Sequence, residues 1–484
     1  MSWSNYQQAV FDFIQNDTRH CVVNAVAGSG KSTTGVEALE RTFKAGRGSN
    51  LKFLAFNKHI EVDINAKLAD RLLPQWASTY NAFGNGILRA NGFNGRFVKS
   101  NKTNLICDAN GVPFKLKSVF TRVASLCKNL LLFTPNLELI EELCGIYDID
   151  IPKGMKDKFR QFAEFIIVTT QRERQIYDFD DQKFIPICEN FEVPSFDLLM
   201  VDEFQDTCPV EEALITRSNS RLGVFGDPHQ AIYSFKGTSA DAMVMFKNKF
   251  DAVELPLSIC YRCPIEVVKA AQDIVPHIEC APNAIQGEVG TINQEKFFSL
   301  LKQERDTLVL CRVTADLVTN VSKLLSMGVP AYVLGKDFKE VLLRIVDSVT
   351  NGANLNIADY NRCLREYVSS KLDYFQETGN ADKVTYWQDL ETSLENFAEG
   401  CKTSNDVKQR ISDIVKEGEV LGAVCHMTIH KSKGLEGKKD KAVCILRPDK
   451  LPHPRASNVE EEMRLKYVAI TRSRGQLYYV EHKE

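Results

Sequence analysis

The clearest pattern in the 484-residue chain is a series of short apolar runs separated by longer amphipathic stretches. In the first half, four runs rich in Val, Ile, Leu and Phe have the length and composition of buried parallel strands. Between the first two runs, Val36, Leu39 and Phe43 fall on one face of a helix. Strand, helix and strand in this order predict a doubly wound α/β core. The four runs are CVVNAV (21–26), LKFLAFN (51–57), DLLMVDE (197–203) and RLGVFGD (221–227).

A second set of apolar runs predicts a second α/β core later in the chain. Residues 315–328 lie between two of these runs and have helical periodicity that is closed by Gly328. A strand–helix–strand unit is therefore expected here as well. The runs are DTLVLCR (306–312), PAYVLG (330–335), AVCHMTIH (423–430), AVCIL (442–446) and QLYYVEH (476–482).

Two long segments lack strand-like runs and are predicted to be mostly helical insertions, one in each core. The predicted fold class is therefore α/β, with two doubly wound parallel-sheet cores. The first core is assigned to residues 1–83 and 191–254, with an insertion at 84–190. The second is assigned to 255–338 and 422–484, with a short insertion at 339–421.

Composition narrows the class of protein only slightly. The chain is 44% hydrophobic and 25% charged with a net charge of −3, so a nucleic-acid contact would need a local basic groove. The start of the chain shows no secretory signal, and no apolar run reaches the roughly 20 residues of a membrane span. The 14 cysteines are spread thinly, as is typical of a reduced cytosolic protein. Cys260 and Cys263 have CxxC spacing, but the second pair of a zinc site is missing.

The segment NAVAGSGKST (24–33) predicts a phosphate-binding loop between a strand and a helix. Glycines let backbone N–H groups converge on phosphate oxygens, and the helix N-terminus adds partial positive charge. Lys31 can reach the β- and γ-phosphates of a nucleotide, and the Ser32 hydroxyl can hold Mg²⁺. The generic pattern has glycine where Ala25 stands. The residues expected to contact ATP here are Ala27, Gly28, Ser29, Gly30, Lys31, Ser32 and Thr33.

The segment LLMVDEFQD (198–206) places two adjacent carboxylates at the end of an apolar strand. Asp202 is positioned to hold Mg²⁺, and Glu203 could act as the general base on the attacking water. A solvated acidic turn is the alternative, but the preceding apolar strand and the phosphate-binding loop favour a catalytic pair.

A third strand ends in GDPHQAIYSFKG (226–237). Gln230 is a neutral amide that could sense a γ-phosphate without burying a charge. Phe235 followed by Lys236 is the combination that holds single-stranded nucleic acid, by base stacking and phosphate contact. Taken alone, a phenylalanine at position 235 is more often a core residue.

Together, AVAGSGKS, VDEFQD and GDPHQAIYSFKG resemble the superfamily 1 helicases of the UvrD/Rep/PcrA type. The resemblance implies two RecA-like cores, ATP and Mg²⁺ as cofactors, and DNA as the partner. It extends to WSNYQQAV, where Gln7 would contact adenine with Gln8 as the alternative. LSICYRCP (257–264) is similar to the family's L-x-x-N-Y-R-S, so Tyr261 would stack on adenine and Arg262 would reach the γ-phosphate. Near the C-terminus, Glu436 would approach the ribose and Arg472 would be the second arginine at the γ-phosphate.

The same resemblance implies a set of DNA contacts. FLAFNKH (53–59) is similar to a motif that contacts the DNA backbone, and STYNAFG (78–84) to T-x-H-S-F-G, with Asn81 in place of histidine. MTIHKSKGLE (427–436) is similar to T-I-H-K-x-K-G-L-E. Lys236 stands where arginine is usual, which puts a bidentate contact there in doubt. The implied DNA-binding residues are Asn57, Lys58, Phe83, Tyr233, Phe235, Lys236, His430, Lys431 and Lys433.

The resulting hypothesis is an ATP-dependent DNA helicase or single-strand translocase. The residues expected to catalyse its ATP hydrolysis are Lys31, Asp202, Glu203, Gln230, Arg262 and Arg472. ATP would lie between the two cores, and the family implies 3′→5′ movement. The expected partners are single-stranded DNA, its junctions with duplex DNA, and proteins of replication or recombination. The protein is expected to be cytoplasmic and to act as a monomer on DNA. Because the insertion at 339–421 is short, a translocase that displaces proteins and unwinds poorly is one alternative. A P-loop ATPase of signalling or defence, or a binding protein with decayed catalysis, are the others.

Overall fold

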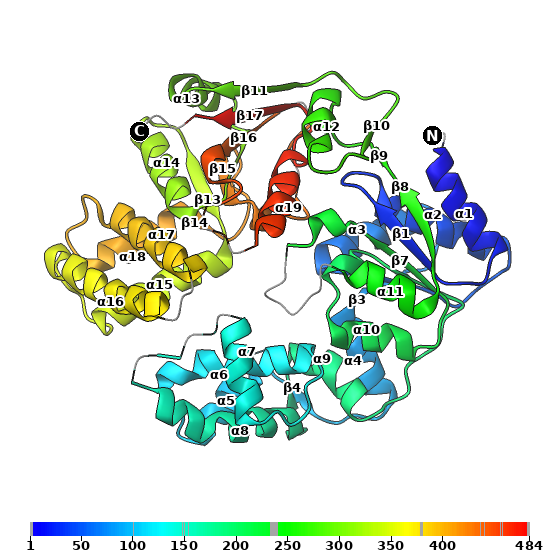
Figure 1. Ribbon diagram of the computed structural model, residues 1–484, viewed down its shortest axis with the longest axis horizontal. Helices are drawn as coiled ribbons and strands as arrows, with labels where there is room; N and C mark the ends of the chain where they lie inside the picture. The colour runs from blue at the N-terminus through cyan, green and yellow to red at the C-terminus, as the bar shows by residue number, and fades with distance from the viewer. Residues whose placement is uncertain are drawn as a thin grey trace. The chain divides into compact units, whose positions relative to one another are not determined.

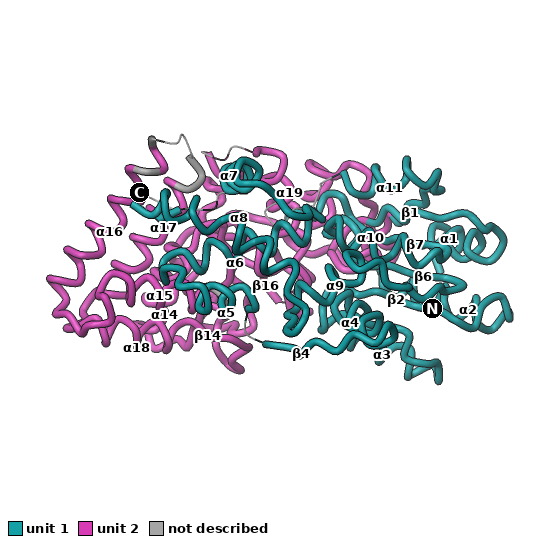
Figure 2. Tube along the Cα trace, turned by 90° about the horizontal axis from the view of Figure 1, so that it is seen from below, with its two compact units in different colours: residues 1–25, 30–257 teal, residues 26–29, 258–484 magenta. Residues whose placement is uncertain are grey.

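The computed structural model describes residues 3–99, 101–147, 149, 151–152, 154–232, 241–377, 381–435, 437–439, 441–454, 456 and 458–481. The chain divides into two compact units, coloured separately in Figure 2. Unit 1 contains residues 1–25 and 30–257, and unit 2 contains residues 26–29 and 258–484. Each unit is built on a parallel sheet, labelled in Figure 1, which confirms the predicted fold class.

The sheet of unit 1 has six parallel strands. All four apolar runs predicted for this part of the chain form central strands, whereas the two edge strands were not predicted. Asn24 lies opposite Gly226, and Val201 opposite Val224, so the carboxyl ends of three neighbouring strands meet at one edge. In spatial order the strands are β3 (Ala77–Thr79), β2 (Leu51–Ala55), β6 (Leu198–Val201), β7 (Leu222–Gly226), β1 (Cys21–Ala25) and β8 (Val253–Leu257).

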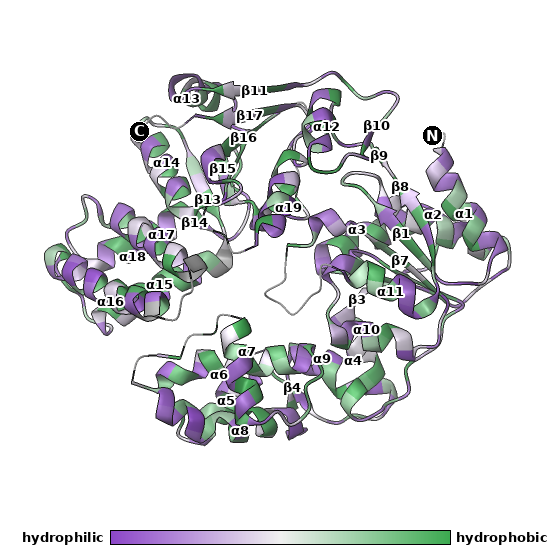
Figure 3. Ribbon diagram, viewed as in Figure 1, coloured by the Kyte–Doolittle hydropathy of each residue, from purple (hydrophilic) through white to green (hydrophobic). Residues whose placement is uncertain are grey.

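Helices cover this sheet through two separate clusters of buried hydrophobic residues. One cluster includes Phe11, Leu39 and Phe53, and the other includes Leu199 and Phe246. Figure 3 shows hydrophilic and hydrophobic stretches alternating along helices such as α1, as expected when one face packs on a core. The helices are α1 (Asn5–Asn16), α2 (Lys31–Lys44), α3 (Lys58–Ala69), α4 (Tyr80–Ala90), α10 (Pro209–Arg217) and α11 (Ala242–Phe250), with short 3₁₀ turns η1 (Phe204–Asp206) and η2 (Pro228–Gln230).

The first predicted insertion is helical and has a hydrophobic core of its own. Within it the rings of Phe120 and Phe159 stack with centroids 5.3 Å apart. A short parallel pair of strands lies beside the helices. The elements are β4 (Arg96–Phe97), α5 (Lys102–Ala109), α6 (Phe114–Asn129), α7 (Leu137–Ile146), α8 (Lys156–Arg172), β5 (Ile176–Tyr177) and α9 (Phe179–Cys188).

The sheet of unit 2 has seven parallel strands, and the five runs predicted for this part of the chain all belong to it. The two edge strands, β11 and β14, were not predicted, and β14 comes from the segment that was predicted to be helical. In spatial order the strands are β11 (Glu288–Ile292), β17 (Gln476–Val480), β16 (Ala442–Leu446), β12 (Leu308–Cys311), β15 (Val424–Thr428), β13 (Ala331–Leu334) and β14 (Val415–Lys416); β9 (Ile259–Cys260) and β10 (Glu279–Cys280) form a separate pair.

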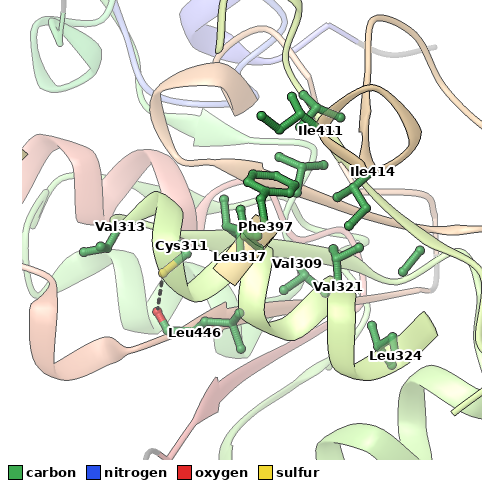
Figure 4. Close-up of a cluster of buried hydrophobic side chains, with 14 of the residues drawn as sticks. Val309, Cys311, Val313, Leu317, Val321, Leu324, Phe397, Ile411, Ile414 and Leu446 are labelled. Carbon is green, nitrogen blue, oxygen red and sulfur yellow. Dashed lines mark hydrogen bonds between the residues drawn. The ribbon is translucent and has the colours of Figure 1, made fainter. Parts of the chain in front are cut away.

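The second insertion differs from the first, because its helices share the hydrophobic core of the sheet. Figure 4 shows Phe397 and Ile411 beside Val309 and Leu317 in this core. The domain boundaries given by the sequence stay predictions, but 339–421 has no separate core among the described residues. The helices of unit 2 are α12 (Ile265–Gln272), α13 (Gln294–Gln303), α14 (Thr314–Ser326), α15 (Lys336–Thr350), α16 (Ile357–Glu377), α17 (Ala381–Ala398), α18 (Ser404–Ile414) and α19 (Val459–Ile470), with 3₁₀ turns η4 (His430–Ser432) and η5 (Pro448–Lys450).

Candidate nucleotide and nucleic-acid sites

The Gly-rich loop between β1 and α2 has the backbone geometry of a phosphate cradle. Gly28 and Gly30 have φ values of +69° and +82°, in the left-handed region that favours glycine. Helix α2 then begins at Lys31, so its first N–H groups lack partners within the helix and are suited to an anion. The buried Ser29 hydroxyl has no hydrogen-bond partner in the part of the chain that the structure describes. This loop therefore fits a phosphate group.

Lys31 lies against the acidic pair at the end of β6. Its Nζ atom is 3.1 Å from Oε1 of Glu203 and 3.2 Å from Oε2. Burial alone would lower the pKa of Lys31, but the charges of Glu203, Asp202 and Asp227 outweigh burial and raise that pKa above its usual value. Lys31 is therefore a fixed positive charge beside the phosphate cradle.

Asp202 and Ser32 form the second half of this arrangement. The Ser32 hydroxyl donates to Oδ2 of Asp202 at 2.7 Å, and only 2% of Asp202 is exposed. Burial, and secondarily the neighbouring charge of Glu203, raises the pKa of Asp202 to about 6. A hydroxyl and a carboxylate side by side are a suitable partial ligand set for Mg²⁺, which takes its remaining ligands from phosphate and water. The two residues therefore fit the metal that the resemblance implies.

Glu203 is held in an unusual backbone conformation, with φ +51°. A non-glycine residue in this region is uncommon and persists when its surroundings hold it there. Gln205 supplies part of that support, because its Nε2 donates to Glu203 at 2.5 Å and its Oε1 accepts from the N–H of Asp227 at 3.0 Å. Gln230 in turn donates to Asp227 at 2.7 Å. Buried amides thus connect the ends of β6 and β7.

Gln205 was missed by the sequence analysis. It is fully buried, although glutamine is usually exposed. The available signal was an amide placed two residues after an acidic pair at a strand end. That position alone does not reveal that the amide reaches the neighbouring strand.

Of the two glutamines considered for adenine, Gln7 is the one placed beside α2. Its Nε2 donates to the hydroxyl of Thr34 at 3.1 Å, and its Oε1 accepts from the N–H of Ser4 at 3.1 Å. Gln8 instead donates to Asp12 on its own helix. Contact of Gln7 with a base stays a prediction.

In unit 2, the segment that carries Tyr261 and Arg262 packs closely on the loop residues 26–29 that belong to the same unit. The N–H of Tyr261 donates to the carbonyl of Gly28 at 2.9 Å. A Cβ atom at Gly28 would lie 2.5 Å from Cβ of Arg262, so only glycine fits there. The side chain of Tyr261 is 45% exposed, as ring stacking on a ligand requires. Arg262 donates to the carbonyl of Thr471 at 3.3 Å.

Arg472 is the largest fully buried side chain of the described residues, with 1% exposed. Its guanidinium donates to the carbonyls of Leu435 at 2.7 Å and Val468 at 3.0 Å. A phosphate contact by this residue stays a prediction.

Of the predicted DNA contacts of unit 1 that the structure describes, two are accessible and one is not. Asn57 and Lys58 are exposed at the start of α3, where Asn57 caps the helix and Lys58 pairs with Glu61 at 2.7 Å. Phe83 is only 6% exposed and packs against Phe196 with ring centroids 6.0 Å apart. The ring of Phe83 therefore belongs to the core in this conformation, and a DNA contact by Phe83 stays a prediction.

The predicted contacts of unit 2 lie on η4 and just after it. Lys431 is exposed and Lys433 half-buried. Burial, with the charges of Arg312 and Lys433, lowers the pKa of His430 to about 3. His430 is therefore neutral at physiological pH, and a DNA contact by this residue stays a prediction. Tyr233, Phe235, Lys236 and Glu436 lie outside the described residues.

The described residues show neither a metal-binding cluster nor a membrane-spanning helix. In the described part of the chain, no group of three or more His, Cys, Asp or Glu side chains is arranged to hold a metal ion. No helix with described residues is both long and apolar enough to span a bilayer.

Two family models match most of the chain. Residues 5–251 match the UvrD/REP helicase N-terminal domain, and residues 356–484 match the UvrD-like helicase C-terminal domain.

Individual relatives are more distant. The chain is 20% identical over 395 residues to a probable DNA helicase II homolog of Mycoplasma capricolum, an alignment that covers 59% of this chain and 55% of that protein. It is 23% identical to the ATP-dependent DNA helicase UvrD2 of Mycobacterium bovis, covering 62% of this chain and 51% of the relative. It is 29% identical to the ATP-dependent DNA helicase Rep of Escherichia coli, covering 30% and 23%. The chain thus spans about half the length, or less, of the relatives it matches.

Proposed function

Because the chain belongs to the UvrD/Rep helicase family, we propose that it is an ATP-dependent helicase or translocase that moves along single-stranded DNA. The observation that carries this proposal is the group formed by Lys31, Ser32, Asp202 and Glu203 at one sheet edge. A cation, a hydroxyl and two carboxylates beside a phosphate-binding loop form a set of groups suited to phosphoryl transfer.

In the proposed mechanism, the first turn of α2 and Lys31 bind the β- and γ-phosphates. Ser32 and Asp202 would hold Mg²⁺, which would supply charge neutralisation when bound. Glu203 would orient the attacking water and accept its proton. When ATP binds, Lys31 gains phosphate as a new partner, and this releases the Glu203 carboxylate for that task. Gln205 keeps Glu203 in position throughout.

Arg262 and Arg472 are proposed to stabilise charge on the transferred phosphoryl group, and Gln230 to sense its presence. Base stacking and phosphate contact would come from the 233–236 segment, from Lys58 and from Lys431. Movement in the 3′→5′ direction, a preference for junctions of single-stranded and duplex DNA, and action as a monomer in replication, repair or recombination are further parts of the proposal.

A translocase that mainly displaces bound proteins is the second candidate. Its support is the second insertion, whose helices share the hydrophobic core of unit 2. An element packed in this way is less free to move as a separate domain than the first insertion, which has its own core. Weak unwinding together with efficient movement would follow from this difference.

The test is the ATP hydrolysis rate with single-stranded, 3′-tailed, 5′-tailed and blunt DNA, followed by unwinding and protein displacement on the same substrates. We expect stimulation by single-stranded DNA and activity on the 3′-tailed substrate. A rate unaffected by any DNA would contradict the proposal and favour an ATPase of another kind. Displacement without unwinding would select the second candidate.

A further inference from the structure

Two cysteines flank the residues of unit 2 that are predicted to contact the nucleotide, in the order Cys260, Tyr261, Arg262, Cys263. Cys260 ends β9, and Cys263 lies two residues before α12 begins. Both are buried, with exposed fractions of 0% and 3%. The N–H of Cys263 donates to Sγ of Cys260 at 3.4 Å, so the segment folds back on itself and brings the two residues together. In the helicase motif that this segment resembles, asparagine and serine stand at these two positions.

The surroundings shift the pKa values of the two thiols in opposite directions. A hydrogen bond from the Cys263 thiol lowers the pKa of Cys260 below its usual value, and this bond outweighs burial. The same bond, together with burial, raises the pKa of Cys263. Cys260 is therefore the better nucleophile, and Cys263 stays protonated beside it. The two thiols are therefore asymmetric, with one better suited to attack and the other to resolve a disulfide.

We propose that Cys260 and Cys263 are an oxidative modification site, at which a peroxide closes a disulfide that slows ATP hydrolysis. This inference rests on the proposed function. The Cys260 thiolate attacks the O–O bond of the peroxide and becomes a sulfenic acid, releasing hydroxide or, from an organic peroxide, an alkoxide. The sulfur of Cys263 then attacks the sulfenic sulfur and loses its proton, and water leaves as the S–S bond forms. Two thiols are oxidised by two electrons and the peroxide is reduced.

The disulfide would act on hydrolysis through contacts that both residues share with the arginines. Sγ of Cys263 lies 3.7 Å from the carbonyl oxygen of Thr471, and the guanidinium of Arg262 donates to the same carbonyl at 3.3 Å. Thr471 directly precedes Arg472 in the chain. Oxidation removes the thiol donor and closes a small ring around Tyr261 and Arg262. The position of Arg262 relative to Thr471 would therefore change, and with it the transition-state contact proposed for that arginine.

Close packing adds a second route to the same effect. Sγ of Cys260 would lie 3.1 Å from a Cβ atom at Gly28, and the N–H of Tyr261 donates to the carbonyl of Gly28. Because the sulfur lies beside Gly28, a change in its bonding would be transmitted to residues 26–29. In the reduced protein these contacts fix the position of Tyr261 relative to residues 26–29.

The first experiment is peptide mapping by mass spectrometry of the full chain after treatment with hydrogen peroxide. We expect a linkage between Cys260 and Cys263 that dithiothreitol reverses. Cys280 is a competing disulfide partner for Cys260, because it lies directly opposite Cys260 in the β9–β10 pair. A linkage of Cys260 to Cys280, or no linkage at Cys260, would overturn the proposal. This mapping does not depend on whether the protein hydrolyses ATP.

The second experiment compares ATP hydrolysis before and after oxidation. We expect a fall on the order of tenfold in the oxidised protein and recovery on reduction. The double variant Cys260→Asn, Cys263→Ser carries the side chains of the related motif and is expected to keep its rate and lose the response to peroxide. The matched control Cys280→Ser should respond like the unmodified protein. Equal inhibition of the double variant would overturn the proposal.

Failure of this inference can be separated from failure of the proposed function. If the reduced protein hydrolyses ATP with DNA stimulation but peroxide has no effect, only the oxidative site is wrong. If the reduced protein has no ATPase activity, the proposed function is wrong, and the mapping still decides whether the disulfide forms. The single variant Cys263→Ser gives a further check, since it should stop at sulfenic acid on Cys260 without forming the linkage.

Discussion

At the scale of single residues, Asp202 is a buried carboxyl group that destabilises the folded chain once it is ionised. Its carboxyl group is buried beside a second carboxylate, and its pKa is raised to about 6. A carboxyl group whose pKa is raised in the folded state binds protons more tightly there than in the unfolded chain. The protonated carboxyl group therefore stabilises the folded chain at low pH, and this stabilisation is lost as pH rises through about 6. Above that pH the ionised group lowers the free energy of unfolding. A bound Mg²⁺ would remove this penalty.

Replacement of Asp202 by asparagine is therefore expected to stabilise the ligand-free protein while it abolishes Mg²⁺-dependent hydrolysis. At pH 8 the free energy of unfolding should rise by about 3 kcal/mol, because the pKa of Asp202 is raised from 3.8 to about 6 and each pKa unit corresponds to about 1.4 kcal/mol. At pH 5 the gain should be smaller, because Asp202 is then largely protonated. Urea titrations at both pH values measure the difference, with the exposed Asp108→Asn as control. Equal destabilisation at both pH values would contradict the assignment.

The neighbouring Glu203 gives a separate test of the chemistry. Glu203→Gln keeps the shape of the side chain but removes the base, so hydrolysis should slow by a factor on the order of 10²–10⁴. ATP binding should be retained, since Lys31 and the loop are unchanged. Single-turnover hydrolysis and equilibrium binding of ATP distinguish the two steps. Glu212→Gln, on the adjacent helix α10, is the matched control and should leave both unchanged. A near-normal rate for Glu203→Gln would remove it as the base.

At the scale of elements, the first insertion is organised around a buried ionic network. Lys102 pairs with Asp181 at 2.8 Å, and Lys128 pairs with the same residue at 2.7 Å. Asp178 caps α9 and also accepts from the N–H of Lys102. All four side chains are almost completely buried. Such a network stabilises a fold only while it is complete, because removing one partner leaves an uncompensated charge.

We expect Lys102→Met to lower the free energy of unfolding of the insertion by about 3 kcal/mol or more. The control is Lys117→Met, which breaks an ion pair with the exposed Asp108 and should cost about 1 kcal/mol or less. Because the insertion has its own core, the loss should appear first as faster amide hydrogen exchange in α5, α6 and α9. Equal effects of the two substitutions would show that the buried network contributes no more than a surface pair.

The elements also show which parts of the molecule can be predicted from sequence. Central strands such as β1 and β16 are continuous apolar runs because both of their faces are buried, so they are recognised directly. Edge strands such as β8 and β14 are short or partly exposed, and β8 contains Pro256, which only an edge strand tolerates. They carry no comparable signal.

The same distinction applies to the candidate sites. Residues at the end of a recognisable strand, such as Lys31 and Asp202, could be placed because the motif fixes their local backbone. The bridge made by Gln205, the burial of Phe83 and the carbonyl contacts of Arg472 depend on residues far away in the sequence. Only tertiary packing determines them.

At the scale of the whole molecule, the net charge of −3 bears directly on the proposed DNA binding. A chain with a slight excess of acidic residues gains no general attraction to a phosphate backbone, so binding must depend on a few local lysines. Lys58 and Lys431 are predicted contacts that the structure leaves exposed. Each phosphate contact releases counterions, so the number of contacts can be counted from the salt dependence of binding.

For Lys431→Ala we therefore expect weaker binding of single-stranded DNA and a shallower dependence of the logarithm of the binding constant on the logarithm of salt concentration. Loss of one contact should change this slope by about 0.7. Fluorescence titration of a labelled oligonucleotide at several salt concentrations measures it. The control is Lys44→Ala on α2, an exposed lysine with no predicted DNA contact, which should leave the slope unchanged. An equal change for both variants would mean that binding depends only on the net charge of the protein. An unchanged slope for Lys431→Ala would show that this residue does not contact DNA.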